Sequence, residues 1–93
     1  MTIEESRREI DRVNKRIAGN VRDRMDEVLK IMDFKDREDM DIRDEEREEK
    51  VRQQFEQLFE DKKMPPERGR ELADVLIETA VDVQKEFLED DEK

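Results

Sequence analysis

Cysteine, histidine, tryptophan and tyrosine are all absent from this sequence of 93 residues. Without cysteine or histidine, the chain can form neither a disulfide nor a metal site built from these two ligands. Its one serine, Ser6, lies near the amino end, so a nucleophile with an adjacent base is hard to build. Gly19 and Gly69 are isolated, which argues against a glycine-rich phosphate loop. Any chemistry must therefore come from positioning and electrostatics.

Apolar residues are scarce as well, at 32% of the chain against 54% charged residues. At this length a single domain over residues 1–93 is expected, because chains divide only when one core stops growing. A domain this small has little apolar area to set against chain entropy, and it lacks a disulfide that could help. Association with a second chain is the expected remedy.

The formal net charge is −10, which makes duplex nucleic acid and anionic membranes poor partners. No apolar run approaches the roughly 20 residues of a membrane span, and the amino end has no signal-peptide core. The expected location is the cytoplasm. Residues 1–40 are nearly neutral, with ten basic and eleven acidic side chains, so this part of the chain is locally rich in cations compared with the rest.

Apolar residues recur every three or four positions, which predicts helices over residues 3–35, 44–62 and 66–89 and an all-α fold. Residues 36–43 are dense in charge and read as a connector. Asp44 is suited to cap the second helix, and Pro66 to open the third. The first helix is so long that its apolar stripe must be covered by other helices or by another chain.

Charged and polar residues interrupt these apolar stripes at positions that should face inward. They are Arg7, Arg24 and Lys35 on the first predicted helix, Asp44, Arg47 and Glu48 on the second, and Gln84 on the third. Because Arg24 and Lys35 are eleven residues apart, they share one helix face. Desolvated cations need a negative partner. That partner is either the internal pair Asp44 and Glu48 or a small dianion held by the surplus positive charge.

These residues resemble the pattern of the all-helical chorismate mutases, whose members are three-helix chains that form an intertwined homodimer. Arg7, Arg24 and Lys35 are similar to the family's first-helix pattern. An Asp followed after two residues by Arg-Glu is similar to its second-helix signature, and Gln84 to its third-helix position. The resemblance covers nearly the whole chain. Ala80 departs from it, because some members have a hydroxyl residue there.

The resemblance implies a role for each of these residues, with no metal and no cofactor. Arg24 and Arg47, with Arg7 reaching in from the other subunit, would hold the two carboxylates of chorismate. Asp44 and Glu48 would bind the ring hydroxyl. Lys35 and Gln84 would donate hydrogen bonds to the ether oxygen, and a substrate contact at Ala80 would be lost. Apolar walls are expected from Ile31, Ile77 and Val81, although ordinary core is an equally good interpretation of these three.

The function implied is a chorismate mutase of the shikimate pathway toward phenylalanine and tyrosine. Rearrangement of chorismate to prephenate is pericyclic, so it needs conformational restriction and stabilisation of charge on the ether oxygen, without a nucleophile. Two alternatives stay open. One is an isochorismate pyruvate lyase of the same fold, and the other is a non-catalytic, acidic helical interaction module.

Overall fold

The protein is described here by a computed structural model covering residues 2–91, with side chains described through residue 88. This range contains three helices and no strand: α1 (Ile3–Arg37), α2 (Glu45–Asp61) and α3 (Pro66–Asp91). The predicted all-α fold class is therefore confirmed. α1 and α3 each end two residues later than expected from the sequence, and α2 lies one residue inside its expected bounds at both ends.

Each helix starts at a residue that deals with the unpaired N–H groups of its first turn. The side chain of Thr2 accepts a hydrogen bond from the Glu5 amide at 3.1 Å, which satisfies a free N–H of α1. Asp44 does the same for α2, because its Oδ1 accepts from the Arg47 amide at 3.1 Å. Pro66 is the first residue of α3, where a missing N–H costs nothing.

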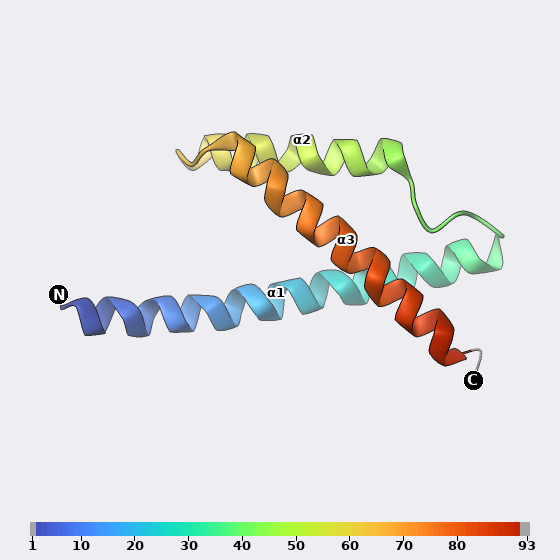
Figure 1. The fold of residues 1–93 in the computed structure, drawn as a ribbon, viewed down its shortest axis with the longest axis horizontal. Coiled ribbons are helices and arrows are strands. Elements are labelled where there is room, and N and C mark those ends of the chain that lie inside the picture. The colour runs from blue at the N-terminus through green and yellow to red at the C-terminus, as the bar shows by residue number, and fades with distance from the viewer. Residues whose placement is uncertain (1, 92–93) are drawn as a thin grey trace.

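The three helices form an open arrangement rather than a bundle (Figure 1). α2 and α3 are joined by a tight turn in which Lys63 adopts a φ of 60°. α3 then crosses the C-terminal half of α1 and packs against both other helices, more extensively against α2. The N-terminal half of α1 extends beyond the other helices. The 54 Å length of the molecule is therefore set by α1, which spans about 52 Å at 1.5 Å per residue.

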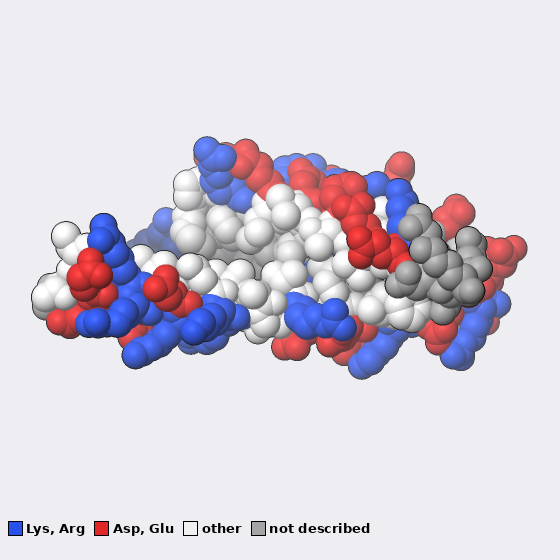
Figure 2. Space-filling model, turned by 60° about the horizontal axis from the view of Figure 1, so that its bottom comes forward, with Lys and Arg blue, Asp and Glu red and all other residues white. Residues whose placement is uncertain are grey.

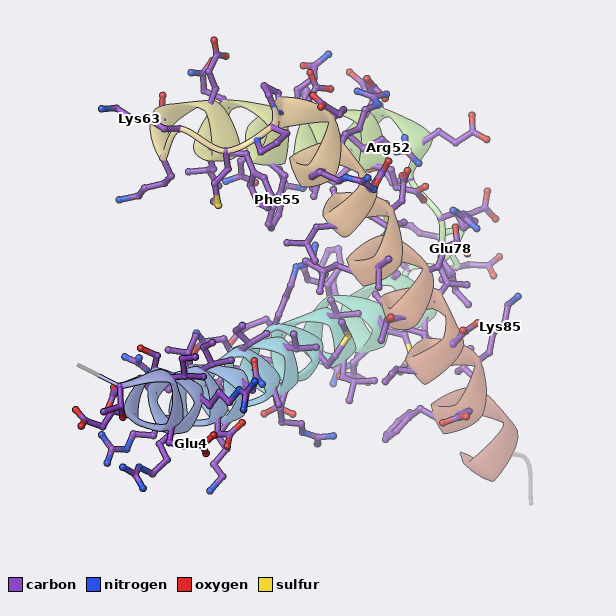
Figure 3. All side chains as sticks on the ribbon, turned by 60° about the vertical axis from the view of Figure 1, so that its left-hand side comes forward. Glu4, Arg52, Phe55, Lys63, Glu78 and Lys85 are labelled. Carbon is purple, nitrogen blue, oxygen red and sulfur yellow. The ribbon has the colours of Figure 1, made fainter. Side chains whose placement is uncertain are left out.

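The tightest packing lies between α2 and α3. Phe55 packs against a small buried cluster and points from α2 toward the inside of the fold (Figure 3). The cluster consists of Val51, Ala73 and Ile77. Gly69 is what allows the helices to approach, since a Cβ there would collide with the Phe55 carbonyl and lie 2.8 Å from Cγ of Phe59. The absence of a side chain at Gly69 therefore lets the backbone of α3 approach α2 closely.

The apolar stripe of α1 is buried only in the C-terminal half of the helix, where Met25 and Met32 lie in the core. Toward the amino end Ile3, Ile10 and Ile17 are 71%, 57% and 54% exposed. Figure 2 shows an uncharged band across the middle of one face, with acidic and basic side chains on either side. Exposed apolar surface of this kind is typical of a contact with another chain. No helix within the described range is long and apolar enough to cross a membrane.

Candidate active site

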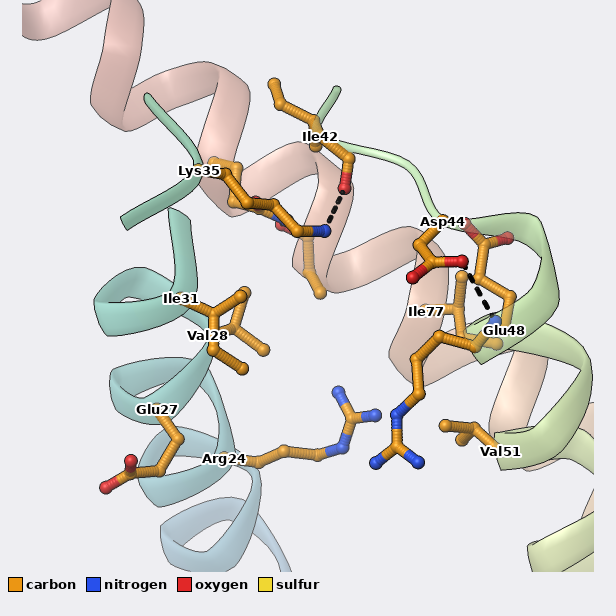
Figure 4. A pocket seen from close by; sticks show the side chains of 13 residues that line it. Arg24, Glu27, Val28, Ile31, Lys35, Ile42, Asp44, Glu48, Val51 and Ile77 are labelled. Carbon is orange, nitrogen blue, oxygen red and sulfur yellow. Dashed lines mark hydrogen bonds between the residues drawn. The ribbon is translucent and has the colours of Figure 1, made fainter. Parts of the chain in front are cut away.

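A cavity of about 290 Å³ lies where α1, α2 and α3 face one another, and it opens to solvent. Its charged and polar lining comes from all three helices and from the residue that caps α2 (Figure 4). These side chains are Arg24, Glu27 and Lys35 from α1, Asp44, Arg47 and Glu48 from the start of α2, and Gln84 from α3. This volume suits a small molecule about the size of a substituted six-membered ring.

Seven of the eight residues predicted to bind substrate line this cavity: Arg24, Lys35, Asp44, Arg47, Glu48, Ala80 and Gln84. The eighth, Arg7, lies near the exposed end of α1 and pairs with Glu4 at 2.9 Å. Arg7 and Arg24 are 17 residues apart, or about 25 Å along a helix. The cavity of a single chain is thus built without Arg7.

Within the part of the chain that the structure describes, the cations of the cavity have no carboxylate partner. None of the ion pairs formed by the described residues involves Arg24, Lys35 or Arg47. Burial lowers the pKa of Arg24, and the nearby charge of Arg47 lowers it further. Lys35 Nζ donates to the Ile42 carbonyl at 3.1 Å, a neutral acceptor (Figure 4). The positive charge in this cavity is therefore available to a bound anion.

Of the acidic residues at the start of α2, the two that line the cavity are engaged elsewhere. Asp44 caps α2, and Glu48 accepts hydrogen bonds from Arg43 Nε at 3.2 Å and Arg43 Nη2 at 2.9 Å. Arg52 approaches the same carboxylate at 3.6 Å. None of the described ion pairs joins Asp44 or Glu48 to one of the inward-facing cations, which argues against internal neutralisation. Of the two partners considered for the inward-facing cations, the internal one is therefore not found among the described ion pairs.

Gln84 is the one polar side chain among the described residues that is buried, at 6% exposed. Its Nε2 donates to the Ala80 carbonyl at 3.0 Å, one turn earlier on α3. A glutamine amide carries two N–H donors, so the second stays available to a ligand. Lys35 likewise keeps two of its three N–H groups after bonding to Ile42.

The apolar wall differs in part from the one expected. Ile31 and Ile77 line the cavity as predicted, together with Val28, Ile42 and Val51. Val81 does not line it: this residue is buried, 6% exposed, and belongs to the core instead.

Sequence spacing could have indicated two of the residues that were missed. Val28 and Val51 each lie four positions after a predicted cation, Arg24 and Arg47, on the same helix face. Ile42 could not be found this way, because it lies in the connector, where no helical period applies.

The arrangement offers cations, hydrogen-bond donors and an apolar wall, which suits binding and charge stabilisation of a small dianion. Among the described residues, no group of three Asp or Glu side chains converges to hold a metal ion. The sequence profile of a protein family described as chorismate mutase type II matches residues 6–85. No curated protein and no solved structure matches the chain.

Proposed function

The chain belongs to the chorismate mutase type II family, a family of isomerases, and we propose that it converts chorismate to prephenate in the cavity between its three helices. One observation carries this proposal: Arg24, Lys35 and Arg47 converge beside the buried Gln84 with no carboxylate partner among the described ion pairs. Chorismate carries two carboxylates. It matches a cavity in which positive charge is the unsatisfied feature.

The reaction places specific demands on the residues of this cavity. The ether bond of chorismate breaks while a carbon–carbon bond forms, and negative charge grows on the ether oxygen in the transition state. The free N–H groups of Lys35 and Gln84 are proposed to donate to that oxygen. Because these donors are already oriented by Ile42 and Ala80, little reorganisation is needed as the charge develops.

The substrate must also be held in its compact, reactive conformer. Arg24 and Arg47 are proposed to bind the carboxylates, and Asp44 and Glu48 the ring hydroxyl. Ile31 and Ile77 would press on the ring from the apolar wall. Restriction of this kind can lower the activation barrier by several kcal/mol, because the bound geometry excludes unproductive conformers before the reaction begins.

A homodimer is proposed to complete the site. The exposed stripe at Ile3, Ile10 and Ile17 needs a partner, and a second copy of α1 is the simplest one. An arrangement in which α1 reaches across would bring Arg7 of one chain to the cavity of the other. We further propose, from the family alone, that the enzyme acts in the cytoplasm in the synthesis of phenylalanine and tyrosine.

The decisive experiment presents purified protein with chorismate and, separately, with isochorismate. Prephenate formation from chorismate is expected. Pyruvate release from isochorismate without prephenate formation would replace this proposal with the lyase of the same fold. A third measurement uses a bicyclic dicarboxylate that mimics the transition state, which should raise the melting temperature of the protein. If the protein turns over neither substrate and its melting temperature does not rise, it is a non-catalytic interaction module.

A further inference from the structure

The charges that line the cavity cancel formally, which is unexpected for a site that binds a dianion. Three cations stand against the three carboxylates Glu27, Asp44 and Glu48. Two of those carboxylates, however, are paired with cations that do not line the cavity. Glu27 is paired with Lys30 at 2.9 Å, and Glu48 with Arg43 at 2.9 Å. With both pairs counted, three cations face Asp44 alone, which leaves a surplus of two positive charges.

These two pairs differ in how firmly they are built. Lys30 and Glu27 form an exposed pair on one helix, and such pairs are weak. The Glu48 side chain is only 12% exposed, and Arg43 holds both of its oxygens through two N–H groups. A two-point contact of this kind fixes the direction of a carboxylate as well as its charge. Glu48 therefore depends on Arg43 more than Glu27 does on Lys30.

Arg43 is itself held from α3. Its Nη2 also donates to Glu78 Oε1 at 2.7 Å, across 35 positions of the chain, and this hydrogen bond lowers the pKa of Glu78. Glu78 lies on α3 (Figure 3). The guanidinium thus ties the connector to both helices behind the cavity wall.

The residues on either side of Arg43 also belong to the site. Ile42 precedes it and supplies the carbonyl that holds Lys35, and Asp44 follows it as the cap of α2. From these contacts we propose that Arg43 is a positioning residue for substrate binding, which orients Glu48 and neutralises its charge from outside the cavity. This inference rests on the proposed function of the chain.

The test compares kcat and KM for chorismate in Arg43→Ala with those in Arg68→Ala. Arg68 is an exposed arginine paired with Glu71 at 2.7 Å, so both variants lose one positive charge. Loss of a charge-assisted contact of this kind predicts a KM about tenfold higher in Arg43→Ala, with a smaller change in kcat. Arg68→Ala should match the wild type. Arg43→Lys should lie between, because lysine keeps the charge without the two-point geometry.

A double-mutant cycle separates positioning from a merely structural role. If Arg43 acts through Glu48, then Arg43→Ala should raise KM by less than about twofold in a Glu48→Gln background. An undiminished effect in that background would show that Arg43 acts through the fold and would overturn the inference. The inference also fails if KM in Arg43→Ala equals that in Arg68→Ala. Either result leaves the proposed function intact, whereas wild-type protein that does not turn over chorismate would remove both.

Should Arg43→Ala fail to fold, Arg43→Gln and Glu78→Gln replace it. Glu78→Gln removes the anchor on α3 but leaves the contact between Arg43 and Glu48 in place. A rise in KM smaller than that of Arg43→Gln is expected. A larger rise would mean that the link to α3, rather than the charge of Glu48, is what matters, and the inference would be wrong.

Discussion

Arg24 on α1 and Arg47 on α2 line the same cavity, and the charge of Arg47 adds to the effect of burial in lowering the pKa of Arg24. Holding the half-buried Arg24 close to a second cation costs free energy until an anion reaches them. The ligand-free protein is therefore destabilised by a repulsion between cations that a bound dianion would reduce.

Replacing Arg24 with methionine should stabilise the empty protein while abolishing tight substrate binding. Removing a half-buried, unpaired cation is expected to add on the order of 1 kcal/mol to the free energy of unfolding. For a chain of this size the melting temperature would then rise by about 4–8 °C. Arg22→Met is the matched control, because Arg22 is exposed and pairs with Asp26 at 3.0 Å. Equal melting temperatures for the two variants would contradict the prediction.

Lys35→Ala should impair the chemical step far more than the fold. Loss of a donor to a developing oxyanion typically costs about 10²–10³-fold in kcat. The melting temperature should change little, because the hydrogen bond lost is one partly buried contact to the Ile42 carbonyl. Steady-state kinetics with Lys50→Ala, an exposed lysine on α2, provides the comparison. Near-normal turnover in Lys35→Ala would remove Lys35 from the proposed chemistry.

Gln84→Glu should shift the activity toward acid pH. Only the protonated carboxyl can donate a hydrogen bond to the ether oxygen, so kcat should rise as the pH falls through the pKa of the introduced group. Gln84 is nearly fully buried, which favours the neutral form of a carboxyl placed there. The pH profile is measured beside that of Gln53→Glu, whose position is exposed. Identical profiles would assign Gln84 a structural role.

Mixing Arg7→Ala chains with Arg24→Ala chains should restore part of the activity that each variant lacks alone. In a heterodimer one of the two sites would combine an intact Arg7 with an intact Arg24. Activity is measured after the mixed species has been separated from both parent dimers. Heterodimers as inactive as the parents would show that Arg7 does not act across the interface.

Alanine at the two glycines should have opposite effects on stability. Gly69→Ala places a methyl group against the Phe55 carbonyl and Phe59, so overpacking should cost about 1–3 kcal/mol. Gly19 has no atom within 4 Å of the position its Cβ would take, and in mid-helix the same change should add roughly 1 kcal/mol. Thermal unfolding of both variants tests the pair. A stable Gly69→Ala protein would show that α2 and α3 separate easily.

Much of this molecule could be predicted without coordinates because its helices obey local rules. Capping by Asp44, the start of α3 at Pro66 and the inward face of Arg24 and Lys35 all follow from residues fewer than a dozen positions apart. Helical periodicity is a short-range property, so the sequence carries it directly. The same holds for the absence of histidine and cysteine, which had already narrowed the chemistry to electrostatics.

Contacts between distant segments could not be anticipated in this way. Val81 fits the period of an inward face, yet it is packed in the core rather than in the cavity wall. The pairing of Glu48 with Arg43, and of Arg43 with Glu78 on another helix, depends on the path of a connector that has no period. Whether a carboxylate cancels a neighbouring cation or leaves it free is settled by three-dimensional proximity. Tertiary packing therefore established which charges of this chain are left for a ligand.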